Sequence, residues 1–116
     1  MDFSFTKSDK IRKSRDYSLL KETGSVFKTK LMVFNYSVSE RTKLGVIVTK
    51  KVGNSVFRNR VKRWIREVFR TERGRFVTPV DLVMIPRQSS LSYEDIKRDF
   101  LYFAVKLNGK SSNRIN

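Results

Sequence analysis

The amino-acid sequence predicts a single small α+β domain in which helices cover one β-sheet. Three observations support this prediction. The chain has 116 residues, enough for one modest hydrophobic core. Segments with helical spacing alternate with short runs of β-branched and aromatic residues, in the order helix, two or three strands, helix, strand, helix. Because apolar residues make up 39% of the chain and include nine Phe, it should fold despite a net charge of +15.

The two ends of the chain should add little to this core. Residues 1–13 are mostly polar and basic, which indicates an N-terminal arm. Residues 110–116 have the composition of a frayed tail. No internal repeat or low-complexity segment divides the chain, so we predict one domain over residues 1–116.

The first helix is expected in the segment SRDYSLLKETG. Ser14 is of the type that caps a helix N-terminus, and Tyr17 and Leu20 share one helical face. Gly24 suits the position just after the helix.

The predicted strands are rich in Val, Ile, Leu and aromatic residues. Residues 31–38 and 44–50 are separated by a polar segment, which predicts a hairpin or an adjacent pair. Residues 26–30 are a further candidate strand. The apolar run 81–85 has the character of a central strand, and Pro86 should end it.

The last helix has the most complete signals. Ser92 and Asp95 have the spacing of a capping box, and Leu91 and Ile96 occupy the positions of a hydrophobic staple. Apolar residues then follow helical spacing until the pair at 108–109, Asn-Gly, where we expect the helix to end.

The positive charge is concentrated in the middle of the chain. Residues 41–75 hold 12 basic and two acidic residues, a net charge of +10. Such a segment repels itself unless a polyanion lies nearby, so nucleic acid is the first candidate partner and an anionic membrane surface the second.

Other classes of function are excluded by composition. Without Cys or His the chain has no disulfide, no thiolate nucleophile, no usual zinc ligand and no imidazole base. The first ten residues lack the apolar segment of a secretory signal, and no apolar run is long enough to span a membrane. We therefore expect a cytoplasmic protein.

Most of the central charge lies on a second predicted helix, which Asn54 or Ser55 should cap and which should end near Gly74. On a helical projection its apolar residues form one side, which we expect to pack on the sheet as ordinary core. The opposite side is cationic and consists of Arg58, Asn59, Lys62, Arg63, Arg66 and Arg70.

The cationic side does not follow the charge pattern of a solvated helix. Arg58, Lys62 and Arg66 are like charges four residues apart, and each such pair is destabilising. Residues 54–70 hold five Arg and one Lys, and guanidinium groups bind two phosphate oxygens at once and stack on bases. This favours RNA over a membrane. DNA is less favoured, because no helix-turn-helix pair or zipper is present.

The turn before this helix is a second candidate phosphate contact. Lys50 and Lys51 end a predicted strand, and Gly53 can adopt a positive φ that brings the backbone close to a ligand. A simple tight turn explains the same residues equally well.

The stretch KKVGNSVFRNRVKRWIREVF resembles the signature of the protein subunit of bacterial ribonuclease P, whose hallmark is a basic Arg-Asn-Arg segment, here residues 58–60. The resemblance extends to RDYSLLKETGSV, LGVIVTKK, DLVMIPR and LSYEDIKRDF. It implies an αβββαβα two-layer sandwich with a left-handed βαβ crossover, similar to a domain of a ribosomal protein and of elongation factor G.

The resemblance also implies a function. The family forms a ribonucleoprotein that removes the 5′ leader from precursor tRNA. An RNA subunit performs the endonucleolytic chemistry with Mg²⁺ that is held mainly by RNA, and the protein binds that RNA and the leader without supplying catalytic residues. A direct Mg²⁺ ligand from Asn59 or a nearby carboxylate stays open on the sequence. The implied partners are therefore the ribonuclease P RNA and precursor tRNA.

The residues to which the resemblance assigns a role in this sequence form two groups. The RNA-binding residues are Lys50, Lys51, Asn54, Arg58, Asn59, Arg60, Lys62, Arg63, Arg66 and Arg70. A cleft for the single-stranded leader would consist of Tyr17, Lys21, Phe34, Tyr36 and Lys62. Phe34 and Tyr17 are also explained as ordinary core. Lys21 stands where the family often has a Phe, so we expect weaker base stacking and a steeper salt dependence of leader binding.

Two other functions stay open on the sequence. A structural RNA-binding protein of ribosomal type would have the same basic character. A stand-alone nuclease would need a metal site built from Asp81, Glu94, Asp95 and Asp99, which are better explained as turn and cap residues.

Overall fold

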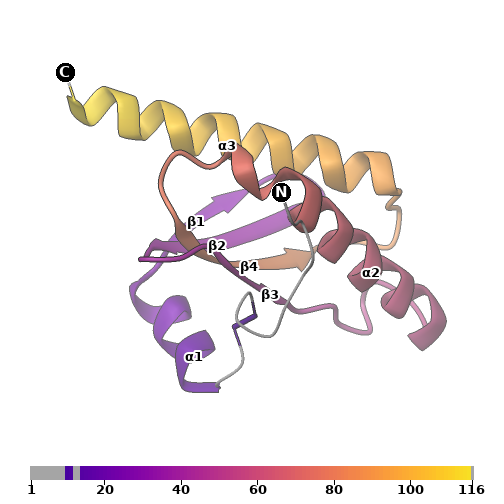
Figure 1. Cartoon of the computed structure of the whole chain (residues 1–116). Helices are drawn as coiled ribbons and strands as arrows, with labels where there is room; N and C mark the ends of the chain where they lie inside the picture. Colours follow the sequence, from indigo (N-terminus) through magenta and orange to yellow (C-terminus); the bar gives the residue numbers. More distant parts are fainter. Residues whose placement is uncertain (1–9, 12–13, 116) are drawn as a thin grey trace.

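The computed structural model describes residues 10–11 and 14–115, so most of the predicted N-terminal arm lies outside the described residues. The chain forms one small α+β domain, as predicted (Figure 1). Its elements are α1 (Ser14–Thr23), β1 (Ser25–Lys28), β2 (Met32–Val38), β3 (Lys43–Val46), α2 (Ser55–Glu72), the short 3₁₀ helix η2 (Arg73–Arg75), β4 (Val80–Pro86) and α3 (Tyr93–Ile115).

The four strands form one sheet in the order β1-β2-β4-β3. β1 and β2 are an antiparallel hairpin, β4 pairs antiparallel with β2, and β3 pairs parallel with β4. The predicted pairing of β2 with β3 is therefore wrong. β4 lies between them because Leu82, Val83 and Met84 are buried toward both faces of the sheet, which suits a central strand. The hand of the β3-α2-β4 crossover stays a prediction of the resemblance.

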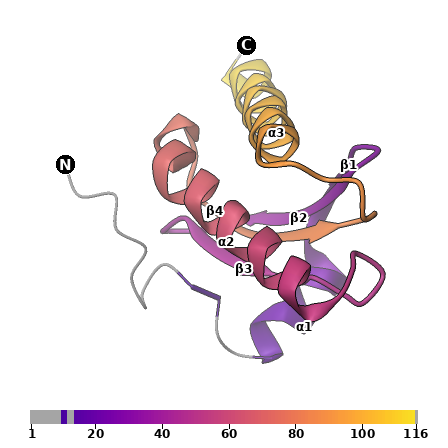
Figure 2. The ribbon, with the colours of Figure 1, turned by 90° about the vertical axis from the view of Figure 1, so that its right-hand side faces the viewer.

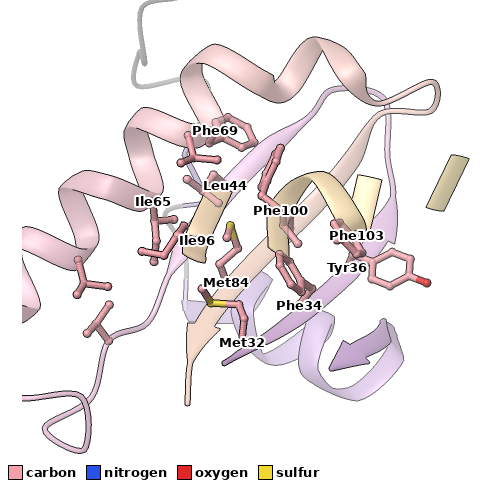
Figure 3. Packing of buried hydrophobic residues seen from close by; sticks show 14 of the residues in the cluster. Met32, Phe34, Tyr36, Leu44, Ile65, Phe69, Met84, Ile96, Phe100 and Phe103 are labelled. Atoms are coloured by element: carbon pink, nitrogen blue, oxygen red, sulfur yellow. The ribbon is translucent and has the colours of Figure 1, made fainter. Parts of the chain in front are cut away.

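The two faces of the sheet are covered differently. α2 and α3 lie on one face, and α1 lies on the other (Figure 2). The main core fills the space between α2, α3 and the sheet, with Phe34, Phe100 and Phe103 among its largest buried side chains (Figure 3). A smaller cluster of Ile11, Leu20 and Val83 lies under α1.

The helix ends agree with the predicted caps in two cases. The Asn54 side-chain oxygen accepts a hydrogen bond from the Phe57 backbone N–H at 2.9 Å, which caps α2. Ser92 and Asp95 exchange side-chain hydrogen bonds with each other's backbone N–H groups, as a capping box requires.

The predicted end of α3 is wrong, because the helix continues past Gly109 to Ile115. Gly109 does not adopt the positive φ that a glycine just after a helix end would have, and the Asn108 side chain holds this part of α3 to the segment after α2. Its Nδ2 donates to the Arg75 carbonyl at 2.8 Å, and its Oδ1 accepts from the Val77 N–H at 3.0 Å. Residues 110–115 therefore extend the helix instead of forming the expected tail.

Candidate RNA interface

The apolar side of α2 packs as its periodicity predicts. Val61, Ile65, Val68 and Phe69 are buried. Trp64 is only partly buried, and its ring meets Phe57 edge to face with the centroids 6.1 Å apart. This packing fixes the rotation of α2 about its axis, so the opposite side must face outward.

The outward side of α2 brings five of the predicted RNA-binding residues together. Asn59, Lys62, Arg63, Arg66 and Arg70 line a shallow hollow of about 450 Å³ along the helix, together with Glu67. The hollow is open and strongly basic, so it fits an extended anionic partner better than an enclosed small molecule.

Glu67 is the one acidic residue that lines this hollow, and it already forms an ion pair with Arg70. The Arg70 Nε donates to a Glu67 carboxylate oxygen at 3.2 Å, and this hydrogen bond holds the Glu67 pKa below its usual range. In the described part of the chain, no acidic side chain forms an ion pair with Lys62, Arg63 or Arg66. Their mutual repulsion is therefore left for an external anion to relieve.

The other predicted RNA contacts lie around the start of α2. Lys50 and Lys51 are exposed in the turn, and Arg60 is exposed outside the hollow. The Arg58 Nε donates to the Gly53 carbonyl at 3.1 Å, so Arg58 also holds the turn in place. Asn54 is used as the helix cap.

Gly53 has the positive φ that the sequence predicts, at 155°. Its N–H donates to the Lys50 carbonyl at 3.2 Å, so this group is engaged in the turn. The first turn of α2 contains no acidic residue, so nothing there opposes the partial positive charge of the helix N-terminus. The tight turn and a nearby phosphate contact are thus compatible.

A second hollow lies between α1 and the face of the sheet opposite to α2 and α3. Its volume is about 570 Å³, and it is lined by Tyr17, Ser18, Lys21, Val26, Lys28, Val33, Asn35, Ile47, Val83 and Ile85. We call it the α1 cleft. Aliphatic side chains make its floor, and Lys21 and Lys28 place exposed charge at its edge. Such a surface suits a flat, partly apolar group that carries negative charge.

Tyr17 lies against β3 in this cleft because Gly45 leaves room for it. A Cβ at position 45 would come within 2.6 Å of the Tyr17 hydroxyl oxygen. Partial burial raises the pKa of the Tyr17 phenol, while a hydrogen bond with the Val46 backbone and the charge of Arg66 act in the opposite direction.

Two of the predicted cleft residues are placed elsewhere. Phe34 is fully buried and stacks on Phe103, with ring centroids 4.6 Å apart and planes within 7° (Figure 3). Tyr36 is 7% exposed and meets the Phe103 ring edge-on at 5.1 Å. Their assignment to the leader cleft is therefore wrong. β2 turns its even-numbered residues toward α3, so Val33 and Asn35 face the cleft instead.

The remaining cleft predictions divide in a similar way. Tyr17 and Lys21 line the α1 cleft, whereas Lys62 lies in the hollow on α2. Val33, Asn35 and Ile47 are cleft residues that the sequence did not reveal. The alternation along β2 showed that only one of its faces could form the cleft. The missing side chain at Gly45 was the signal in the sequence for where the Tyr17 ring packs on the sheet.

The described residues give no support for a protein-held metal. No three Asp or Glu side chains come together in the part of the chain that the structure covers. Asp95 serves the cap of α3, and Asp99 accepts a hydrogen bond from the Thr29 hydroxyl at 2.6 Å. Asp81 lies within β4 and not in the predicted turn. Among residues 10–11 and 14–115, no helix is apolar and long enough to cross a membrane.

Comparison with known proteins decides the family. A family model described as ribonuclease P matches residues 5–108 of this chain. The chain belongs to the ribonuclease P protein family. The ribonuclease P protein component of Thermotoga maritima is 35% identical over 109 residues, which cover 92% of each chain. That of Syntrophus aciditrophicus is 43% identical over 99 residues, which cover 80% of this chain and 82% of the relative.

Solved structures of ribonuclease P proteins share the fold. The Staphylococcus aureus protein matches with a TM-score of 0.76 and 27% identity, over 88% of this chain and 96% of that one. The Thermotoga maritima protein matches with a TM-score of 0.74 and 26% identity, over 82% of this chain and 94% of that one. The fold shared with these two structures thus covers 82–88% of this chain.

Proposed function

We propose that the chain is the protein subunit of a ribonuclease P holoenzyme, in which it binds the catalytic RNA and the single-stranded 5′ leader of precursor tRNA. In this role it promotes endonucleolytic removal of the leader. The relatives' shared name, ribonuclease P protein component, supports membership of such an assembly. The two hollows support a division of the work between two RNAs.

The observation that carries the proposal is a group of three basic residues on the cationic side of α2. Lys62, Arg63 and Arg66 stand together without an acidic partner in the described residues, on a helix whose other side is fixed in the core. A polyphosphate backbone of the catalytic RNA would relieve their repulsion and gain counterion release. Arg side chains suit this contact because each can bind two phosphate oxygens.

The α1 cleft suits the leader. The exposed part of the Tyr17 ring can stack on a base, an interaction worth about 1–3 kcal/mol that every base can make. Lys21 and Lys28 at the edge would contact leader phosphates. Tyr17 lies against the edge strand β3, which also contacts α2, so a strand that leaves the cleft over this edge would meet the basic hollow of α2, where the catalytic RNA is proposed to bind.

Magnesium is assigned to the RNA. The basic hollow contains a single carboxylate, and Arg70 holds it, so the residues present do not fit a Mg²⁺ site on the protein. RNA phosphates would supply the oxygen ligands. The protein contributes positive charge that brings two polyanions together, and it orients the leader.

Reconstitution tests this proposal. The purified protein alone should leave precursor tRNA intact, and the protein with the cognate RNA subunit should release the 5′ leader at a Mg²⁺ concentration at which the RNA alone is slow. The control is the double variant Arg63→Ala/Arg66→Ala, which should need more protein for the same rate. Cleavage by the protein alone, or no stimulation of the RNA by folded protein, would refute the proposal.

A further inference from the structure

α1 is held on its face of the sheet by few apolar contacts. Among the α1 side chains that the structure describes, those of residues 17–23, Leu20 alone is buried and Tyr17 is partly buried. Leu20 packs with Ile11 and Val83 in the small cluster on this face (Figure 2). α3, on the other face, is anchored by several fully buried side chains of the main core. Apolar burial therefore holds α1 less firmly than α3.

Two buried polar atoms on this face of the sheet lack a hydrogen bond. Asn35 on β2 is 8% exposed, and its Oδ1 has no partner in the described part of the chain. The same is true of the Oδ1 of Asp81 on β4. Within residues 10–11 and 14–115, no other buried side-chain nitrogen or oxygen lacks a partner. Both oxygens are closed to solvent, so neither water nor a ligand can reach them unless a neighbouring element moves.

The neighbouring element of both oxygens is the last turn of α1. Gly24 is the single residue between α1 and β1, and a Cβ there would come within 2.9 Å of the Asn35 Oδ1 and 2.5 Å of the Leu20 carbonyl oxygen. Asp81 lines a small hollow of about 80 Å³ together with residues of α1 and β2, namely Leu19, Leu20, Thr23 and Ser37. The end of α1 therefore covers the two unpartnered oxygens.

The position of α1 on the sheet is subject to two opposing effects of similar size. Burial of Leu20 and of part of the Tyr17 ring stabilises it. Each unpartnered oxygen destabilises it, because the same oxygen would accept a hydrogen bond from water if it were exposed. Lifting the end of α1 off the sheet would hydrate both oxygens while the main core stays packed. α1 is therefore the helix that should open at the lowest free energy.

We propose that α1 is a movable wall of the α1 cleft, which in the free protein exchanges between this closed position and an open one in which Asn35 and Asp81 are hydrated. Gly24 is the pivot, since this residue alone joins α1 to β1. The wall brings Tyr17 and Lys21 to the cleft only when it is closed. The second step rests on the proposed function: the leader binds the closed position alone and so holds α1 on the sheet.

Amide hydrogen exchange of the free, full-length protein tests whether α1 opens by itself. The comparison is between wild type and Ile96→Val, a substitution in the main core that weakens the whole fold. The variant should speed exchange in the buried part of α3 by about two- to tenfold and leave the amides of residues 18–23 unchanged, because α1 opens while the core stays packed. Equal acceleration of residues 18–23 would overturn the proposal, since α1 would then exchange only through global unfolding.

Two substitutions of Asp81 test the cause of the opening. Asp81→Val removes both the charge and the buried oxygen, whereas the matched control Asp81→Asn removes the charge and keeps an oxygen. Residues 18–23 should exchange about fivefold or more slowly in Asp81→Val than in Asp81→Asn, the effect of one unpartnered buried acceptor. Asp81 lines the small hollow and not the α1 cleft, so neither change touches the proposed leader contact. Equal rates at residues 18–23 in the two folded variants would overturn the proposal.

A leader oligonucleotide separates this proposal from the proposed function. At ten times its Kd, the oligonucleotide should slow exchange of residues 18–23 in the wild type about tenfold, because it binds the closed position alone. Binding in a fluorescence titration without slower exchange at these residues would overturn the coupling of α1 to the leader. An oligonucleotide that does not bind at all would refute the proposed function, and exchange in the free protein would still decide whether α1 opens.

Discussion

Replacing Phe34 by Ala separates its role in the core from a role in RNA binding. The side chain is fully buried and stacks on Phe103, so truncation removes apolar burial, leaves a cavity and breaks an aromatic pair. Loss of a buried Phe side chain costs about 3–5 kcal/mol, and the broken pair places Phe34→Ala near the upper end of that range. The free energy of unfolding of a domain of this size is roughly 5–15 kcal/mol, so the variant should be only marginally stable.

Urea denaturation of wild type, Phe34→Ala and Phe34→Leu measures this destabilisation. Phe34→Leu keeps most of the volume and should be less stable by about 1–2 kcal/mol. Under conditions in which Phe34→Leu is fully folded, its affinity for a leader oligonucleotide should equal that of the wild type. A folded Phe34→Leu protein with wild-type stability and weakened leader binding would show that Phe34 lies in the cleft, and would refute the assignment of the two faces of β2.

Three further predictions follow from the site and its supports. Tyr17→Ala should weaken leader binding by about 1–3 kcal/mol in a fluorescence titration made where the variant is fully folded, since Tyr17 also packs on the cluster under α1, and an unchanged affinity would remove Tyr17 from the site. Gly45→Ala should displace the Tyr17 ring, because the new Cβ would lie 2.6 Å from its hydroxyl oxygen, so leader affinity should fall in the folded variant. Hydrogen bonds from Ser92 hold the Asp95 pKa below its usual range, so this carboxylate stabilises the fold above the ordinary carboxyl pKa and loses that effect as the pH falls through the lowered value. Asp95→Asn should therefore be less stable than wild type at pH 7 in denaturant titrations, with the difference closing in acid, and a difference independent of pH would contradict this cause.

The order of helices and strands was predictable because it depends on local patterns. The capping box of Ser92 and Asp95 and the amphipathic spacing of α2 are both contained within single segments. The orientation of the basic side of α2 followed from the same spacing, since burying Val61 and Ile65 leaves Arg63 and Arg66 exposed.

The errors arose where distant segments decide the outcome. Strand pairing joins residues far apart in sequence, so the insertion of β4 between β2 and β3 could not be derived from the polar segment between those two strands. Alternation along β2 gave two sets of side chains, but the position of α3 decided that Phe34 belongs to the core. The Asn-Gly pair did not end the helix, since Gly109 keeps a negative φ while the Asn108 side chain binds the backbone near η2, a contact between segments far apart in sequence.

The salt dependence of RNA-subunit binding tests most directly whether bound phosphates explain the cationic side of α2. Arg63 and Arg66 are the best pair to replace, because both line the hollow without an acidic partner in the described residues, whereas Arg58 also holds the turn at Gly53. For Arg63→Ala/Arg66→Ala, the slope of log K against log salt should become shallower by about 0.7–0.9 for each phosphate that the variant no longer binds, while the ion-paired control Arg98→Ala keeps the wild-type slope. A double variant with the wild-type slope would mean that this side of α2 faces solvent in the complex.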